Sequence, residues 1–269
     1  MSDKFALDGN TRREIARKLY DAQKHNSPIE LLTQTYPDIS VDDAYDIQKE
    51  FLTLRFARDR ATTVGRKIGI TSRGMMKMLN CDTPDYGALL DDTIIYEGSA
   101  CDISALNLPI VEGEIAFIMG EDLNGAPFTP ADIINATSWV VPCFEVCDVR
   151  FSSWKITVRD TIADNAAAAR FMIGSAPKRI DEVNLRNVGM VMEKNGVLTG
   201  SAAGAEVMGN PVTAVTWLAN KLSHYCDRLK KGDIVLSGAF MAAVPAEAGD
   251  CFTLSVDGFP SLSMRFDNL

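Results

Sequence analysis

The sequence is poor in the features that mark several protein classes. Its 269 residues include only two histidines, and none of the six cysteines forms a Cys-x-x-Cys pair, so a cysteine–histidine zinc site is excluded. No stretch approaches 18 consecutive apolar residues, and the N-terminus lacks the apolar segment of a signal peptide. We therefore expect a cytoplasmic protein with free thiols and no membrane partner.

Positive charge is also scarce. The chain has 27 lysines and arginines against 36 aspartates and glutamates, a formal net charge of −9, which opposes a protein whose main task is to bind nucleic acid. Neither a Gly-x-Gly-x-x-Gly motif nor a Walker loop is present, so a Rossmann fold is not favoured. Hydrophobic residues make up 46% of the chain, enough for a sizeable core without disulfides.

The first sixty residues carry helical patterns. Thr11 and Glu14 have the spacing of a capping box, and Ile15 and Leu19 follow at helical intervals. Residues 40–43 resemble a second capping box. No polar side chains converge on these helices, so we expect residues 1–62 to form a helical region that serves as scaffold or subunit contact.

Short strands and turns dominate residues 63–269. The sequence predicts two tight hairpins, at Asn195-Gly196 and Asp257-Gly258, and two helices that begin at Thr129-Pro130 and Asn210-Pro211. Strands are expected at residues 63–71, 93–97, 114–119, 139–147, 169–173 and 233–240. These elements predict an α+β fold: a β-rich catalytic domain preceded by the helical region.

Three carboxylates stand among apolar residues. Glu112 and Glu114 are two positions apart, so a strand would direct both side chains to one face, and Glu145 is the only charge within residues 139–147. A buried carboxylate needs a partner, and oxygen ligands without histidine favour Mg²⁺ or Mn²⁺. The alternative is that Glu112 and Glu114 face solvent while Glu145 pairs with an arginine.

Lys67 and Asp85 are further candidates. Lys67 has glycines two positions away on either side, at Gly65 and Gly69, which would leave the backbone bare around the amine, as when a ligand lies close. The alternative is a solvated lysine on an edge strand. Asp85 lies in Pro84–Gly87, a segment whose sequence predicts a turn. In turns, aspartate commonly has only a conformational role.

The remaining reactive side chains have simpler interpretations. Asp160 and Asp164 are four residues apart, and helix capping or loop hydrogen bonds explain them as well as chemistry does. Cys143 and Cys147 share a strand face and are expected to belong to the core, because no partner histidine accompanies them. His25 and His224 fall on predicted helices, and no Ser-His-Asp set is present.

Five segments together resemble a known family, the 2-oxopent-4-enoate (2-hydroxypenta-2,4-dienoate) hydratases and the related 4-oxalocrotonate decarboxylases of the fumarylacetoacetate-hydrolase superfamily. The segments occur in the order typical of these proteins, and the resemblance runs from about residue 40 to the C-terminus. They are residues 66–72 (RKIGITS), 84–87 (PDYG), 112–117 (EGEIAF), 142–146 (PCFEV) and 160–166 (DTIADNA).

The resemblance implies a fold and a site. The fold would be a mixed, curved β-sheet roll with peripheral helices and an N-terminal helical extension, in a cytoplasmic homo-oligomer that can associate with a neighbouring enzyme of its pathway. The resemblance also implies roles for eight residues: Glu112, Glu114 and Glu145 as ligands of Mg²⁺ or Mn²⁺, Lys67 and Asp85 as the acid/base pair, and Thr71, Asp164 and Ser237 as substrate contacts.

The activity that the resemblance implies is the metal-dependent addition of water to a 2-hydroxydienoate in aromatic meta-cleavage catabolism. 2-Hydroxypenta-2,4-dienoate would give 4-hydroxy-2-oxopentanoate. Two alternatives stay open: a decarboxylase acting on 2-oxo-3-hexenedioate, and a non-catalytic partner subunit. An acidic residue at position 85 favours the hydratase, since decarboxylases of this family often carry a non-acidic residue there.

Overall fold

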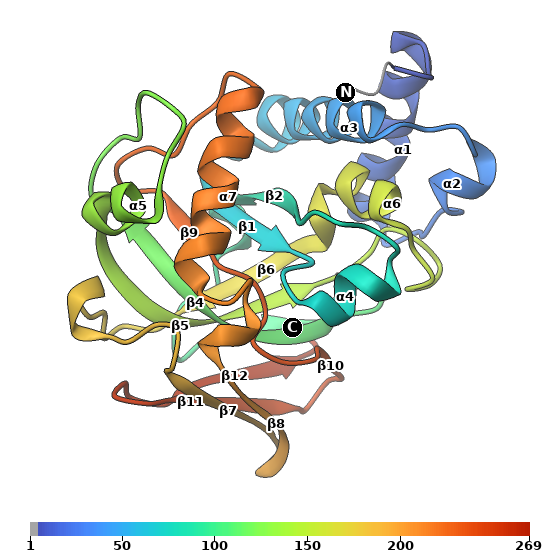
Figure 1. The fold of residues 1–269 in the computed structure, drawn as a ribbon. Coiled ribbons are helices and arrows are strands. Elements are labelled where there is room, and N and C mark those ends of the chain that lie inside the picture. The colour runs from blue at the N-terminus through green and yellow to red at the C-terminus, as the bar shows by residue number, and fades with distance from the viewer. Residues whose placement is uncertain (1–4) are drawn as a thin grey trace.

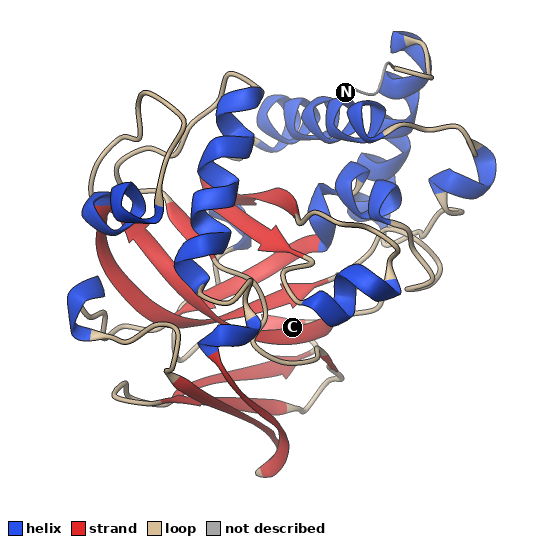
Figure 2. Cartoon of the chain, in the orientation of Figure 1, coloured by secondary structure: helices blue, strands red, loops and turns tan. Residues whose placement is uncertain are grey.

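A computed structural model describes residues 5–269 of the chain, in which α-helices lie against the larger of two β-sheets (Figures 1 and 2). The α-helices are α1 (Gly9–His25), α2 (Leu32–Thr35), α3 (Val41–Leu54), α4 (Arg73–Met78), α5 (Pro130–Ala136), α6 (Val158–Ala163) and α7 (Pro211–His224). One π-helical turn, η1 (Arg55–Asp59), extends α3, and the 3₁₀ turns are η2 (Asp91–Thr93), η3 (Asn165–Ala167), η4 (Ile180–Glu182) and η5 (Gly204–Glu206). No helix among residues 5–269 is long and apolar enough to cross a membrane.

The larger sheet is strongly curved and the smaller one lies at its lower end in Figure 1. The larger sheet has the order β2-β1-β9-β4-β5-β6, with β10 also paired to β4, and the smaller has the order β3-β12-β11-β7-β8. The strands are β1 (Thr63–Gly69), β2 (Asp85–Leu90), β3 (Ala100–Asp102), β4 (Ile110–Met119), β5 (Thr137–Cys147), β6 (Ala168–Ile173), β7 (Gly189–Lys194), β8 (Val197–Ala203), β9 (Ile234–Leu236), β10 (Val244–Pro245), β11 (Cys251–Val256) and β12 (Leu262–Asp267).

Helix starts follow local side-chain chemistry, with one correction. Ser40 and Asp43 form the predicted capping box at the start of α3. The box predicted at Thr11–Glu14 is wrong, because Asp8 is the residue that accepts the free N–H groups at the start of α1. Thr11 lies one turn further on, and its hydroxyl donates to Asp8 (2.9 Å).

The predicted turns agree better with the structure than the predicted strand limits do. β7 and β8 form a hairpin around Asn195-Gly196, and β11 and β12 are joined across Asp257-Gly258. Thr129 and Asn210 cap α5 and α7, each followed by proline. These local predictions are confirmed, since each depends on residues adjacent in sequence.

Two of the predicted strands and one predicted turn differ from the structure. Residues 93–97 do not form a strand: Thr93 ends η2 and Ile94 makes only an isolated bridge to Phe171. The strand predicted at 233–240 is reduced to β9, because Gly238 adopts a positive φ of 108° beyond its end. Asp85 begins strand β2 and pairs with Gly69, so the segment read as a turn is extended.

The core joins both parts of the chain. Residues of α1 and α3, such as Leu19 and Phe51, belong to the same hydrophobic cluster as Phe117, Phe144 and Phe266 of the sheets. The boundary predicted at residues 62/63 falls between η1 and β1. The helical extension is therefore packed on the β-sheets through a shared core, and the division into two domains stays a prediction.

Candidate active site

The register of β4 against β5 brings the three glutamates onto one face of the curved sheet. Glu112 lies opposite Glu145, and Glu114 lies opposite Cys143. Residues of the alternate positions, such as Ile115 and Phe144, belong to the large core cluster. Glu114 and Glu145 have no exposed surface, so the alternative in which Glu114 faces solvent is wrong.

Lys67 reaches the same place from β1. Its side chain is only 3% exposed, with Nζ 3.3 Å from Oε1 of Glu145, and it donates a hydrogen bond to the Ala166 carbonyl (2.9 Å). The alternative of a solvated lysine on an edge strand is therefore wrong, as is pairing of Glu145 with an arginine. β1 lies inside the sheet, between β2 and β9, and this buries the amine.

The two glycines beside Lys67 make room for protein atoms. A Cβ on Gly69 would lie 2.2 Å from Oδ1 of Asp85 and 3.3 Å from Nζ of Lys67. A Cβ on Gly65 would lie 1.8 Å from the carbonyl oxygen of Ile234 on the parallel neighbour β9. Gly69 thus allows the Asp85 carboxylate to lie over β1, and the bare backbone predicted from the sequence is covered by the protein itself.

Unsatisfied polar atoms are concentrated at this site. Among residues 5–269, six of the seven buried side-chain polar atoms without a hydrogen-bond partner belong to Asp85, Glu114, Glu145 and Ser237. An unpaired buried carboxylate costs several kcal/mol, and here several carboxylates face a single ammonium group, Lys67. Oxygen donors with this excess of negative charge fit a hard divalent cation.

The pKa shifts at the site have the same origin. Burial raises the pKa of Asp85 to about 6, although Lys67 opposes the shift. Burial, together with the charge of Glu145, also raises the pKa of Glu112 to about 7 and that of Glu114 well above its usual range. Burial alone would lower the pKa of Lys67, but the carboxylates, Glu145 foremost, outweigh it and raise that pKa. The amine therefore stays charged.

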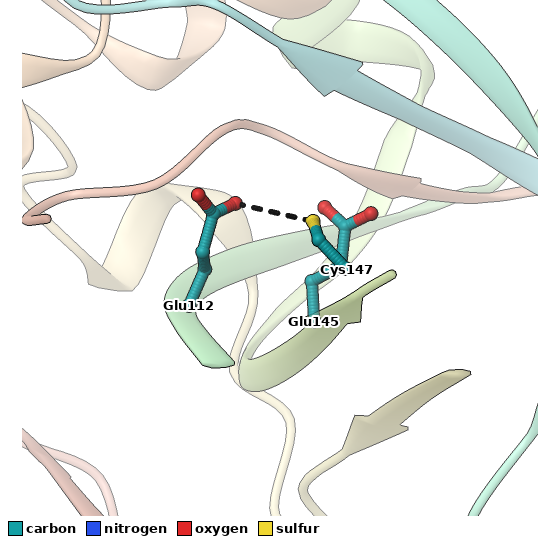
Figure 3. Close-up of side chains that lie close together, drawn as sticks. All are labelled: Glu112, Glu145 and Cys147. Atoms are coloured by element: carbon teal, nitrogen blue, oxygen red, sulfur yellow. Dashed lines mark hydrogen bonds between the residues drawn. The ribbon is translucent and has the colours of Figure 1, made fainter. Parts of the chain in front are cut away.

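The candidate metal-ligand atoms do not all lie equally close to one another. One atom from each of Glu112, Glu145 and Cys147 lies within 4.8 Å of the other two (Figure 3). The Cys147 thiol donates to Oε2 of Glu112 at 3.7 Å. Glu114 stands outside this set, with Oε2 accepting from the Gly238 amide (2.7 Å) and Oε1 left without a partner.

Ser237 and Thr71 lie beside Glu114. The Ser237 hydroxyl is buried without a partner, and its backbone amide donates to the Ile115 carbonyl of β4 (3.2 Å). Thr71 touches the Cα of Gly238, where an added Cβ would lie 2.3 Å from the threonine hydroxyl. Both residues therefore lie near Glu114, and their role as substrate contacts stays a prediction.

Asp164 is bound elsewhere. It is fully buried, and the Arg150 guanidinium and backbone amide (2.9 Å) both donate to its carboxylate. Asp160 caps α6 and also accepts from Thr33, so capping explains this residue. The structure does not bring Asp164 to the glutamates, and its expected contact with substrate has no geometric support.

The turn that follows Asp164 supplies the Ala166 carbonyl that accepts from Lys67. Asn165, Ala166 and Ala167 all have positive φ, between 52° and 58°, a conformation that costs alanine roughly 1 kcal/mol or more. The Asn165 side chain ties this turn to both backbone groups of Ala88 (2.8 and 3.0 Å). Gly87 is required beside it, because a Cβ there would lie 2.2 Å from the Asn165 carbonyl.

Two members of the site were missed by sequence reasoning. Cys147 belongs to the core cluster, as expected, but the position of its thiol beside Glu112 was missed, although Cys147 lies two residues from Glu145 and the alternation of a strand puts both on one face. The Ala166 carbonyl carries no sequence signal, because it depends on a strained turn held by distant residues. The first could have been predicted from strand periodicity and the second could not.

Comparison with known proteins identifies the family of this chain. Residues 76–267 match the profile described as Fumarylacetoacetate (FAA) hydrolase C-terminal. The chain belongs to the fumarylacetoacetate hydrolase family. It is 40% identical, over 99% of each sequence, to a 2-hydroxyhexa-2,4-dienoate hydratase of Comamonas testosteroni. It is also 42% identical to a 2-hydroxypent-2,4-dienoate hydratase of Pseudomonas putida, over 81% of this chain and 99% of that one.

A solved structure from this family resembles the whole chain. The 4-oxalocrotonate decarboxylase of Pseudomonas putida G7, complexed with magnesium and adipate, superposes with a TM-score of 0.94 at 34% identity, covering 98% of this chain and all of the other. The expected α+β fold, a curved mixed sheet with peripheral helices, is thereby confirmed. The chain is similar both to hydratases and to a decarboxylase. The fold alone therefore does not show which of the two reactions it catalyses.

Proposed function

We propose that this member of the fumarylacetoacetate hydrolase family is a divalent-metal-dependent hydratase that adds water to a 2-hydroxydienoate. The observation that carries the proposal is a buried group of carboxylates around the Lys67 ammonium group, in which both oxygens of Asp85 and of Glu145 and one oxygen of Glu114 lack a hydrogen bond. Identities of 40% and 42% to two named hydratases support the same reaction.

Glu112, Glu114 and Glu145 would hold the cation. Their carboxylates share a face of the sheet and supply the oxygen donors that Mg²⁺ or Mn²⁺ prefers. When bound, such an ion supplies Lewis-acid stabilisation of the negative charge on the substrate's 2-oxygen. The Mg²⁺ and adipate of the related decarboxylase support this assignment and suit a substrate with a carboxylate.

Lys67 is proposed to bind the substrate's 2-oxygen. The carboxylates keep its amine charged, which suits it to stabilise a developing enolate and to shuttle a proton within the site. The Lys67 ammonium group would donate a proton to C5 of the dienol and regain one from the 2-hydroxyl group, which converts C2–O to a ketone and moves the double bond to C3–C4. C4 then becomes the electrophilic carbon.

Asp85 is proposed to activate the water that adds at C4. Both of its oxygens are free of hydrogen bonds, and burial raises its pKa to about 6, into the range that suits a general base near neutral pH. The water loses one proton to Asp85 as its oxygen bonds to C4, and this proton is then passed on to C3, which returns Asp85 to its carboxylate form. The product from the five-carbon substrate is 4-hydroxy-2-oxopentanoate.

Decarboxylation is the second candidate. It is favoured by the structural similarity to the 4-oxalocrotonate decarboxylase, which would share the metal and the enolate but release CO₂. Supplying 2-hydroxypenta-2,4-dienoate and 2-oxo-3-hexenedioate in parallel separates the reactions. Formation of 4-hydroxy-2-oxopentanoate supports the hydratase, whereas CO₂ release from the second substrate without hydration of the first would overturn it.

The metal centre has its own test, Glu145→Gln. Removing one anionic ligand at nearly constant volume should weaken Mg²⁺ binding at least about tenfold, measured by calorimetry, and lower turnover in parallel. Glu121→Gln is the matched control, because Glu121 is an exposed residue just beyond β4. Equal Mg²⁺ affinity in both variants and the wild type would remove Glu145 from the metal site.

Three further expectations accompany this function. A homo-oligomer, association with a neighbouring enzyme of the pathway and a cytoplasmic location are all proposed from the family resemblance. Light scattering after size-exclusion chromatography tests the first, and co-purification with the enzyme that consumes the hydrated product tests the second.

A further inference from the structure

Cys147 places a sulfur atom among the carboxylates of the site. It ends β5, two residues after Glu145, and its buried thiol lies 3.7 Å from Oε2 of Glu112. Among residues 5–269, the group of at least three potential ligand atoms that lie mutually within 4.8 Å is Glu112, Glu145 and Cys147 (Figure 3). Glu145 has no exposed surface, and neither of its oxygens has a hydrogen-bond partner.

The spacing of these atoms matches a four-coordinate, tetrahedral metal site, which has fewer ligands than the six that Mg²⁺ prefers. With Zn–S near 2.3 Å and Zn–O near 2.0 Å, a tetrahedral ion would hold sulfur and oxygen roughly 3.5 Å apart. The 3.7 Å between Sγ of Cys147 and Oε2 of Glu112 is close to that separation. Glu114 is not needed for this arrangement, because the Gly238 amide already binds one of its oxygens.

The two carboxylates and the thiol of this group prefer different kinds of metal ion. Carboxylate oxygens suit Mg²⁺ and Mn²⁺, whereas a thiolate selects thiophilic ions such as Zn²⁺. Affinity for a given site rises from Mn²⁺ through Co²⁺ and stays high at Zn²⁺, so a soft ion that recruits the sulfur would compete strongly with a hard one.

We propose that Cys147, with Glu112 and Glu145, forms a thiolate–carboxylate binding mode for thiophilic divalent ions at the same centre. In this mode Zn²⁺ or Co²⁺ replaces the hard cation, and Cys147 gives up its proton to become a ligand. The hard cation uses the three glutamates and leaves the thiol untouched. This inference rests on the proposed metal centre and adds the class of ion that would displace its normal occupant.

The absorption spectrum of bound Co²⁺ reports directly whether a sulfur atom is among its ligands. Titrating the metal-free full-length protein with Co²⁺ should produce visible ligand-field bands and a near-ultraviolet sulfur-to-cobalt charge-transfer band that saturates with one ion per chain. Cys147→Val should lose the charge-transfer band and keep ligand-field absorption. Cys226→Ser is the matched control, because Cys226 is an exposed cysteine beyond α7 and its loss should leave both bands.

Competition between ions tests the selectivity. Cys147→Val should weaken Zn²⁺ binding about tenfold or more while changing Mg²⁺ affinity less than about twofold. Circular dichroism checks the fold of the variant, and Cys147→Ala serves as a second variant if valine is not tolerated. A loss of Mg²⁺ affinity as large as the loss of Zn²⁺ affinity would mean that the thiol only packs the site, and would overturn the proposal.

The remaining outcomes separate this inference from the proposed function. Ligand-field bands without a charge-transfer band in the wild type would overturn the cysteine mode and leave the carboxylate centre intact. A charge-transfer band that persists in Cys147→Val would assign the sulfur to another cysteine and also overturn it. Absence of both Co²⁺ and Mg²⁺ binding in the wild type would overturn the metal centre itself.

Discussion

Two buried groups of charged side chains are attached to the turn at Asn165–Ala167, and they are satisfied to different degrees. Arg150 and Asp164 saturate one another: the guanidinium also donates to the carbonyls of Asp148 and Ala168, and the carboxylate accepts a backbone amide as well. The second group, Lys67 with Asp85 and Glu145, leaves both oxygens of each carboxylate without a hydrogen bond.

The difference distinguishes a structural pair from a reactive site. A buried ion pair with all its hydrogen bonds fixes one conformation and has nothing left to offer a ligand. A buried carboxylate without hydrogen bonds is unfavourable in the folded chain and is stabilised when a cation or a proton reaches it. Asp85 and Asp164 both lie in segments that carry the family resemblance, residues 84–87 and 160–166, but of the two only Asp85 has oxygens without a hydrogen bond.

The largest effect is expected for Asp85→Asn. If Asp85 activates water, hydration should fall roughly 10²–10⁴-fold. Stability should not fall, because the carboxylate has no hydrogen bond to lose. The variant should still exchange solvent deuterium into C5, which depends on Lys67, and this is measured by NMR alongside the ultraviolet absorbance of the dienol.

Asp82→Asn is the control for this variant, since Asp82 is exposed three residues earlier in the chain. Equal loss of deuterium exchange and hydration would place Asp85 in the first proton transfer. Unchanged hydration would remove Asp85 from the mechanism and leave the hydratase activity to other groups of the site.

Arg150→Met should lower stability, unlike Asp85→Asn, which should lower activity alone. It leaves the Asp164 carboxylate buried without its cation, so the free energy of unfolding should fall by about 3–5 kcal/mol, measured with urea. Asp164→Asn in the same chain should restore part of this loss. Arg265→Met, which breaks an exposed pair with Asp267, should cost less than about 1 kcal/mol. Similar costs for the two arginine variants would contradict the contrast between the groups.

Gly69→Ala tests the close approach of Asp85 to β1. The added Cβ would lie 2.2 Å from Oδ1 of Asp85, so the carboxylate must move, and a misplacement of about 1 Å can lower turnover about 10²-fold. Gly189→Ala is the control, because a Cβ on this strand glycine would meet no atom within 4 Å. Full turnover by Gly69→Ala would show that the position of Asp85 is not critical.

The smallest effect is expected for Asp43, a buried carboxylate with hydrogen bonds. Burial alone would raise its pKa, but bonds from Ser40 (3.1 and 2.8 Å) and from the Ala6 amide (2.9 Å) outweigh it and lower that pKa. Its stabilising contribution is therefore present above the unfolded pKa of about 4 and is lost as the pH falls through the lower folded value.

The melting temperatures of wild type and Asp43→Asn should accordingly differ at pH 7 and converge below about pH 4. A constant difference across this range would show that the Asp43 charge contributes nothing to folding.

Local patterns in the sequence predicted much of the fold. Capping residues with a following proline located the starts of α5 and α7, and Asn195-Gly196 located a hairpin, because these features depend on neighbouring residues. The predictions for the start of α1 and for a strand at residues 93–97 were wrong: the Asp8 carboxylate accepts the free amides of α1 in place of Thr11, and Ile94 makes only an isolated bridge to Phe171.

The residue pattern along each strand predicts which side chains share a face, but which faces meet depends on how the strands pack together. Two-residue periodicity puts Glu112 beside Glu114, and Cys147 beside Glu145. Only the antiparallel register sets Glu112 opposite Glu145, and only the insertion of β1 between β2 and β9 buries Lys67 against them. The reason is physical: side-chain alternation is a property of a single strand, whereas the desolvation and charge balance of the site arise from strands distant in sequence.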